Sequence, residues 1–165
     1  MKILIAYASK TGTSREMCTL LASLLPNHEV TLADLATATP DPQGFDYIVL
    51  GAPVRMGKLH RAARAYIKEW GEHIATRPHT LFLCCAFADQ FENYAEMLYP
   101  ARLLESAEEV LYFGGELDLS RQRGFDKLLV RMMRSSIQES EDDEAMLPGR
   151  LPEHVRMLAD RLRAR

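Results

Sequence analysis

Five short apolar runs alternate with segments in which apolar residues recur at helical spacing, and this alternation limits what the chain can fold into. The apolar runs cover residues 2–7, 29–35, 46–53, 80–87 and 108–115. The helical patterns cover residues 14–25, 60–75, 92–106 with a break near Pro100, 125–134 and 152–162. Because a strand buried on both faces reads as a continuous apolar run, the pattern predicts a parallel sheet with helices on both sides.

The order of the strands in such a sheet is restricted by the right-handed crossover between parallel strands. The sequence predicts an α/β fold of one domain over residues 1–165, with a doubly wound, five-stranded parallel sheet in the order 2-1-3-4-5. In that winding, ligands bind in the crevice at the carboxyl ends of strands 1 and 3. We therefore expect a ligand site in the loops that follow these two strands.

Charge and cysteine content exclude several classes of function. The 165 residues carry a net charge of -3, which gives no reason to expect a nucleic-acid partner. The three cysteines, Cys18, Cys84 and Cys85, lack metal-ligand spacing, so we expect reduced thiols and no metal site. The N-terminus turns polar after one short run, and no apolar stretch approaches the ~20 residues that span a bilayer. We expect a cytoplasmic protein.

The loop after the first strand, "YASKTGTS" at residues 7–14, contains more hydroxyl groups than a helix cap requires. A helix that begins near Thr13 presents free N–H groups and a partial positive charge, which together attract an anion. Gly12 lets the backbone turn closely around the anion, and Lys10 can face it. The predicted phosphate-binding residues are Ser9, Lys10, Thr11, Gly12, Thr13 and Ser14. The alternative is that Thr13 caps the helix with Glu16 and the remaining hydroxyls lie in a solvated turn.

This loop resembles the phosphate-binding loop of flavodoxins, and the resemblance extends over the length, strand order and loop positions of the chain. It implies that the cofactor is FMN, whose 5'-phosphate would be held by residues 9–14. It also implies that the isoalloxazine ring lies between two further loops, at residues 51–60 and 86–94.

The loop predicted at residues 51–60, "GAPVRMGKLH", is compact at Gly51, Ala52 and Pro53, so its backbone can approach a flat ring. Short-chain flavodoxins commonly carry an aromatic residue here, whereas this chain has aliphatic and basic residues. The candidate cofactor-binding residues in this loop are Ala52, Pro53, Val54, Arg55, Met56 and Gly57.

Two residues of this segment are candidate catalytic residues. Arg55 would place positive charge beside the ring and stabilise negative charge on the reduced flavin, or it is an ordinary surface arginine. His60 has an unperturbed pKa near ~6.5 and can donate or accept a proton near the flavin, or it caps the following helix.

The loop at residues 86–94, "AFADQFENY", lies where the resemblance places the other face of the ring. The candidates here are Ala86, Phe87 and Phe91, with the two phenylalanines as stacking partners and Tyr94 behind them. The loop contains no glycine, in contrast to the usual flavodoxin loop.

A narrower resemblance is to the flavodoxin-like, menaquinone-dependent protoporphyrinogen oxidases, whose "GA-x-x-R-x-G-x-x-H" pattern matches residues 51–60. The string "FGGELDLSRQRGFDKLLVRMM" at residues 113–133 resembles the same group. The resemblance implies an oxidoreductase that passes electrons from a reduced organic donor, such as protoporphyrinogen, to a quinone or another redox partner. The alternatives are an electron carrier that serves a partner enzyme and a flavin-free interaction module.

The helical pattern at residues 125–134 is rich in methionine and has basic residues on its opposite side. Such a stripe belongs to the core, to a homodimer contact or to a membrane interface. The oxidase resemblance favours peripheral contact with the inner face of the membrane through residues 124–134. The acidic run at 139–144 reads as a solvated loop.

Overall fold

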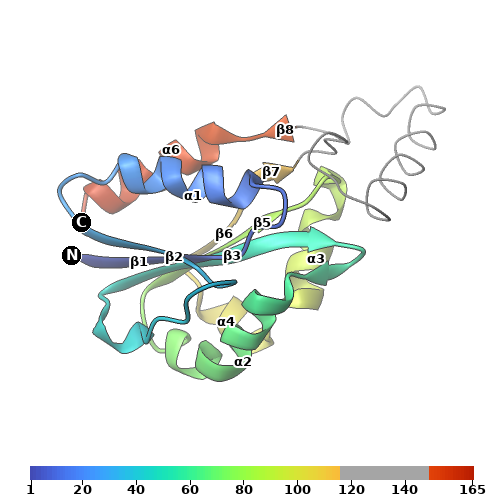
Figure 1. Cartoon of the computed structure of the whole chain (residues 1–165), viewed down its shortest axis with the longest axis horizontal. Helices are drawn as coiled ribbons and strands as arrows, with labels where there is room; N and C mark the ends of the chain where they lie inside the picture. Colours follow the sequence, from blue (N-terminus) through green and yellow to red (C-terminus); the bar gives the residue numbers. More distant parts are fainter. Residues whose placement is uncertain (116–148) are drawn as a thin grey trace.

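A central parallel sheet organises the computed structural model, which describes residues 1–115 and 149–165 (Figure 1). Its parallel strands are β1 (Lys2–Tyr7), β2 (Glu29–Asp34), β3 (Tyr47–Arg55), β5 (His79–Cys84) and β6 (Glu109–Tyr112). They are arranged in the order β2-β1-β3-β5-β6. Counted along the parallel strands alone, this is the predicted order 2-1-3-4-5, so the predicted fold class is confirmed.

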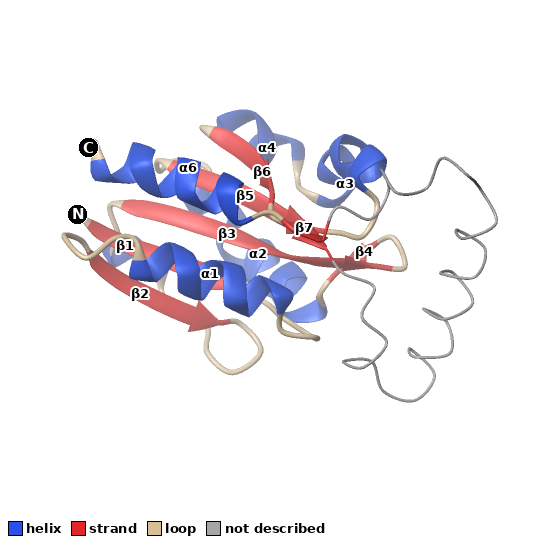
Figure 2. Ribbon diagram, turned by 90° about the horizontal axis from the view of Figure 1, so that it is seen from above, coloured by secondary structure: helices blue, strands red, loops and turns tan. Residues whose placement is uncertain are grey.

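Helices cover both faces of the sheet. Helices α1 (Thr13–Ser23) and α6 (Pro152–Arg163) lie together over one face (Figure 2). Helices α2 (Arg61–Ile74), α3 (Phe91–Leu98) and α4 (Ala101–Ser106) cover the other. The break predicted near Pro100 separates α3 from α4, because Tyr99 and Pro100 adopt extended backbone conformations. The residue before a proline disfavours the helical conformation, which explains the position of the break.

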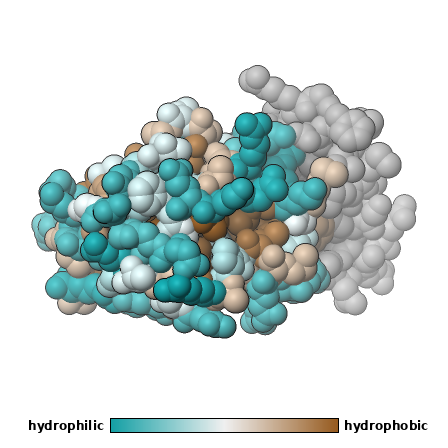
Figure 3. Space-filling model, turned by 90° about the horizontal axis from the view of Figure 1, so that it is seen from below, coloured by the Kyte–Doolittle hydropathy of each residue, from teal (hydrophilic) through white to brown (hydrophobic). Residues whose placement is uncertain are grey.

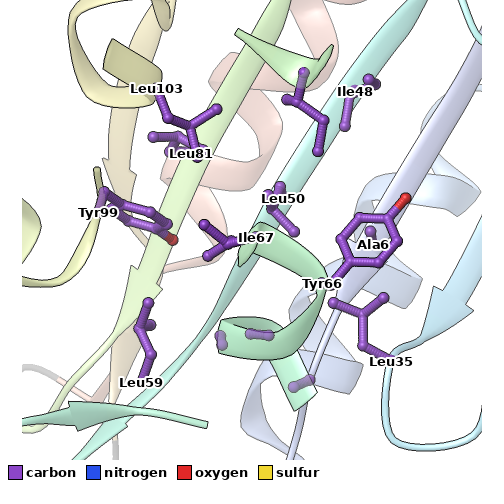
Figure 4. Close-up of a cluster of buried hydrophobic side chains, with 14 of the residues drawn as sticks. Ala6, Leu35, Ile48, Leu50, Leu59, Tyr66, Ile67, Leu81, Tyr99 and Leu103 are labelled. Atoms are coloured by element: carbon purple, nitrogen blue, oxygen red, sulfur yellow. The ribbon is translucent and has the colours of Figure 1, made fainter. Parts of the chain in front are cut away.

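The two faces of the sheet form two apolar clusters because successive strand residues point to opposite sides. Ile3, Ile5 and Phe82 pack with Leu21 of α1 and Leu158 of α6. On the other face, the second cluster packs against α2 and α4 (Figure 4). Its residues include Leu4, Leu50, Leu81, Tyr66, Ile67, Tyr99 and Leu103.

The tyrosines of the second cluster satisfy their hydroxyl groups inside the fold. Tyr99 donates to the carbonyl oxygen of Phe82 at 2.7 Å, and Tyr66 donates to the carbonyl oxygen of Pro40 at 2.7 Å. Burial raises the pKa of both phenols. The aromatic rings therefore add apolar area to the core without leaving buried polar groups unpaired.

The predicted loop at residues 51–60 is wrong: the segment forms a β-hairpin. Strand β3 continues to Arg55 and pairs antiparallel with the two-residue strand β4 (Lys58–Leu59). The connecting residues Met56 and Gly57 both have positive φ, 50° and 69°, as a two-residue type I′ turn requires. Methionine is rarely found in this conformation, so residues 56 and 57 carry little local signal for a hairpin turn.

Gly51 is also placed differently from the expectation. It lies buried inside β3, and a Cβ there would come within 2.2 Å of the carbonyl oxygen of Phe82 and 2.5 Å of its ring. The missing side chain makes room for the neighbouring strand β5. The lack of a side chain at Gly51 therefore allows β3 and β5 to pack closely. The hairpin residues that follow Gly51 lie at the carboxyl end of the sheet.

The predicted strand at residues 108–115 is two separate strands. Strand β6 ends at Tyr112, and β7 (Gly114–Gly115) pairs antiparallel with β8 (Gly149–Arg150). The break follows from Gly114, whose φ of 83° is incompatible with a regular strand. Short 3₁₀ turns occur at η1 (Pro42–Gly44) and η2 (Ala88–Gln90), and β5 ends three residues before the predicted position 87.

The predicted amphipathic helix at 125–134, the membrane contact at 124–134 and the acidic loop at 139–144 lie outside the described residues. Within residues 1–115 and 149–165, every helix is too short or too polar to cross a bilayer. The face that α2 and α4 cover is mostly hydrophilic, with an apolar area near its centre (Figure 3). The most exposed large apolar side chain among the described residues is Met56 at the hairpin tip, which is 73% exposed.

Candidate functional site

The turn between β1 and α1 is folded around Gly12. The Gly12 N–H donates to Oγ of Ser9 at 3.1 Å, and Gly12 adopts a φ of 103°, a conformation that favours glycine. Helix α1 begins at Thr13, as expected, and no side chain caps it. The alternative in which Thr13 caps the helix is therefore wrong, because Thr13 is already the first helical residue.

The first turn of α1 leaves backbone donors for a ligand. The N–H groups of Thr13, Ser14 and Arg15 have no carbonyl partner within the helix, since the first residues of an α-helix precede its hydrogen-bond ladder. The Glu16 N–H is the first to be satisfied, by the carbonyl oxygen of Gly12 at 2.9 Å. The turn and the helix dipole together suit an anion.

Ser14 provides an observation that a ligand would explain. It is 1% exposed, and its hydroxyl group has no hydrogen-bond partner among the residues that the structure describes. The hydroxyl lies near the Cys84 thiol, whose pKa burial raises to about 12 while the hydroxyl opposes the increase. The thiol is at most a weak hydrogen-bond partner, so an acceptor oxygen bound at this turn would give the buried hydroxyl a stronger one.

The remaining residues of the turn differ in exposure. Lys10 is exposed, whereas Ser9, Thr11 and Gly12 are half-buried and Thr13 is buried. The guanidinium group of Arg15 binds the carboxylate of Asp34 at the end of β2 at 2.7 Å. This ion pair ties the first turn of α1 to the neighbouring edge strand.

The hairpin lies at the carboxyl end of β3, at the same end of the sheet as the β1–α1 turn. Ala52 is buried in β3, opposite Leu83 of β5, while Pro53, Val54 and Arg55 are half-buried. Gly57 is half-buried beside the exposed Met56.

The hairpin and the start of α2 are rich in positive charge. Arg55 stands directly opposite Lys58, and like charges in that position are unfavourable. Helix α2 carries Arg61 and Arg64 in its first turn, where it has no acidic residue to balance the helix dipole. These features concentrate positive charge at this end of the sheet.

His60 lies between these elements, as the N-cap of α2. Its Nδ1 accepts a hydrogen bond from the Ala62 N–H at 3.2 Å, so the capping role considered from the sequence is present. Burial lowers the pKa of His60, the carboxylate of Asp34 opposes this, and Lys10 and Arg55 lower the pKa further. Lys10 follows β1, Asp34 ends β2 and Arg55 ends β3. The carboxyl ends of these three strands therefore lie near His60.

The two candidate stacking residues of the third loop have different surroundings. The Phe91 ring, at the start of α3, packs on Tyr112 with 5.4 Å between ring centroids and joins the apolar core. Tyr94 packs against the same cluster. Phe87 and Ala86 are half-buried in the turn before η2. Phe87 is therefore the better placed of the two phenylalanines to contact a ligand.

The loop at residues 86–94 contains no glycine. The glycine that allows close backbone contact just before this loop, at Cys85, lies in β7. A Cβ on Gly115 of β7 would lie 2.2 Å from the carbonyl oxygen of Cys85. The same oxygen accepts a hydrogen bond from the Tyr112 hydroxyl at 2.6 Å. No local sequence pattern links Gly115 to this loop, because only the order of the strands brings the two segments together.

The cysteines are free and buried, as expected for reduced thiols. Burial raises the pKa of Cys18 and raises that of Cys85 to about 11, so both thiols stay protonated at neutral pH. A protonated, buried thiol is a poor nucleophile and a poor metal ligand. In residues 1–115 and 149–165, no group of three or more His, Cys, Asp or Glu side chains could hold a metal ion.

An ion pair not foreseen from the sequence connects the first helix with strand β8. Arg150 of β8 binds the carboxylate of Glu16 in the first turn of α1 at 2.6 Å. Glu16 is therefore engaged by a basic side chain that lies far away in the sequence. No local signal could have revealed this pair.

Residues 4–144 match the flavodoxin domain family. The chain belongs to this family. The protoporphyrinogen IX dehydrogenase (quinone) of Escherichia coli (strain K12) is 24% identical over 143 residues, which are 81% of this chain and 78% of that protein. The flavodoxin of Streptococcus pneumonia TIGR4 has a similar fold, with a TM-score of 0.57, 15% identity and 99% of each chain covered. Flavodoxin 2 of Bacillus cereus has a TM-score of 0.54 and 23% identity, covering 84% of this chain and 99% of that one.

Proposed function

We propose that this flavodoxin-domain protein binds FMN and acts as an oxidoreductase that passes electrons from a reduced organic donor to a quinone or another acceptor. The observation that supports the cofactor most directly is the β1–α1 turn, where a glycine-centred loop, three N–H groups without a partner inside the helix and the buried Ser14 hydroxyl meet at one helix N-terminus. When bound, FMN would supply the redox chemistry.

The residues proposed to hold the phosphate ester are Ser9, Lys10, Thr11, Gly12, Thr13 and Ser14. The donor set fits a dianion, because amides and hydroxyls donate to phosphate oxygens and Lys10 adds a positive charge. The ring would lie toward residues 52–57 on one side and residues 86–91 on the other, where Phe87 is half-buried.

Two observations favour the oxidoreductase over an electron carrier. The edge near the proposed ring carries Arg55, Lys58, Arg61 and Arg64, and positive charge there favours an electron-rich reduced cofactor. The relative from Escherichia coli is a quinone-linked dehydrogenase of protoporphyrinogen IX. Protoporphyrinogen as the donor, quinone as the acceptor, and contact with a membrane or a second copy of the chain are proposals for this protein.

The cofactor is tested by the visible spectrum of the purified protein after incubation with FMN and gel filtration. We expect flavin absorption bands that bleach on addition of dithionite. A colourless protein that takes up no FMN would remove the oxidoreductase and the carrier together, leaving the flavin-free interaction module.

The reaction is tested by mixing the FMN-loaded protein with protoporphyrinogen and a soluble menaquinone analogue under anaerobic conditions. We expect three quinones to be reduced for each protoporphyrin formed, because this oxidation removes six electrons and six protons from the donor and each quinone accepts two of each. A protein that retains FMN but passes single electrons only to a protein partner would instead be a carrier.

The different surroundings of Phe87 and Phe91 predict different effects of alanine substitution. Phe87→Ala should weaken FMN binding by about 1 kcal/mol, the typical contribution of an aromatic contact, and leave the melting temperature of the apoprotein unchanged. Phe91→Ala should lower the free energy of unfolding by about 3 kcal/mol, because it removes a ring packed on Tyr112. Fluorescence titration with FMN and urea unfolding measure the two effects. Equal losses of FMN affinity in both variants would contradict the assignment.

A further inference from the structure

His60 is held in place by three hydrogen bonds, one to its ring and two to its backbone. Its Nδ1 accepts from the Ala62 N–H at 3.2 Å, its backbone N–H donates to the carbonyl oxygen of Pro53 at 3.3 Å, and its carbonyl oxygen accepts from the Arg64 N–H at 3.1 Å. The first and third contacts belong to the start of α2, and the second joins the residue to β3. His60 is thus fixed where the hairpin, β3 and α2 meet.

The capping contact determines the protonation of the ring. A nitrogen that accepts a hydrogen bond from a backbone N–H carries no proton, so the proton of a neutral His60 is on Nε2. Protonation of Nδ1 would place two donors face to face and remove the cap. The fold therefore selects the neutral ring with an N–H at Nε2.

The charged groups around His60 reinforce this choice. Lys10 from the β1–α1 turn and Arg55 from the hairpin disfavour a second positive charge, and Asp34 at the end of β2 is the opposing carboxylate. The charge of Asp34 is already compensated by Arg15, at 2.7 Å. A neutral histidine is accordingly the stable form at neutral pH.

Among the described residues, the structure gives the Nε2 atom no hydrogen-bond partner, although the ring is half-buried at the edge where the proposed FMN site lies. We propose that His60 is an uncharged hydrogen-bond donor of this site, which presents Nε2–H to a carbonyl oxygen or ring nitrogen of the bound heteroaromatic group. This inference rests on the proposed FMN site. It assigns His60 to binding and orientation rather than to proton transfer.

Two substitutions separate this role from the capping role. His60→Asn keeps the cap, because asparagine is a favourable N-cap residue, but its short side chain does not reach as far as Nε2. His60→Gln keeps a long N–H donor but caps poorly. We expect His60→Asn to weaken FMN binding about two- to tenfold with an unchanged melting temperature of the apoprotein. We expect His60→Gln to lower the melting temperature and to bind FMN more tightly than His60→Asn does.

The state of the ring is read directly from long-range ¹H–¹⁵N spectra of histidine-labelled protein, with His60→Asn identifying the signal. We expect the Nε2–H form at pH 7 and a shift of that signal when FMN is added. A charged ring, an Nδ1–H ring, or equal FMN affinity in His60→Asn and the wild type would overturn this inference alone. Wild-type protein that binds no FMN would remove the proposed function and this inference with it.

The same geometry predicts a pH dependence of stability. Because the folded-state pKa of His60 lies below its unfolded value of about 6.5, the unfolded chain binds the extra proton more readily. The stability contributed by the neutral ring is fully present above pH ~6.5 and is lost as the pH falls through the lower folded-state pKa. Urea unfolding of the apoprotein between pH 7.5 and 5 should show this loss, and His60→Asn should show a smaller one. An identical pH dependence in both proteins would contradict it.

Discussion

Replacement of Thr11 and Thr13 together by alanine is expected to weaken FMN binding by about 3 kcal/mol, which is roughly 100-fold in Kd. Both residues belong to the turn that opens α1, and hydrogen bonds to a charged phosphate contribute more than those between neutral groups. The loss is measured by fluorescence titration of the apoprotein with FMN.

The matched control replaces the same two residues by serine, which keeps both hydroxyl groups and removes only the methyl groups. This variant should retain most of the affinity, whereas loss of packing around the buried Thr13 would affect both double variants alike. A comparison with riboflavin, which lacks the phosphate, is also informative. If the alanine variant bound FMN as tightly as the wild type, the phosphate would not lie at this turn.

Gly51→Ala is expected to lower the free energy of unfolding by about 3 kcal/mol or more, a large share of the ~5–15 kcal/mol that stabilises a typical domain. The added methyl group would meet the carbonyl oxygen of Phe82 at 2.2 Å. Because Gly51 pairs with Phe82 in adjacent central strands, the chain cannot move away without breaking the ladder between β3 and β5.

Gly44→Ala is the matched control, since no atom lies within 4 Å of a Cβ at that position. This variant should change the free energy of unfolding by well under 1 kcal/mol, because an exposed surface substitution usually has a small effect. The measurement for both is urea unfolding of the apoprotein. Equal midpoints for Gly51→Ala and the wild type would show that β3 and β5 are not in the close contact described.

Several features of the fold could be read from short stretches of sequence. The apolar runs identified all five parallel strands, and the restricted winding of such chains gave their order. The start of α1 at Thr13 and the interruption at Pro100 were also predicted, because each depends on the backbone preferences of a few adjacent residues.

Other features were decided only by the tertiary structure. Whether Gly51 makes room for a neighbouring strand or for a ligand depends on which residue of β5 lies beside it. The Phe91 ring packs on Tyr112 because the fold brings α3 and β6 together. The hairpin at Met56 and the ion pair between Glu16 and Arg150 likewise depend on pairing between strands or segments. Local sequence determines which residues are buried and where helices begin, since these follow from spacing and backbone preference. Cross-strand neighbours follow from register and packing, which are properties of the whole fold.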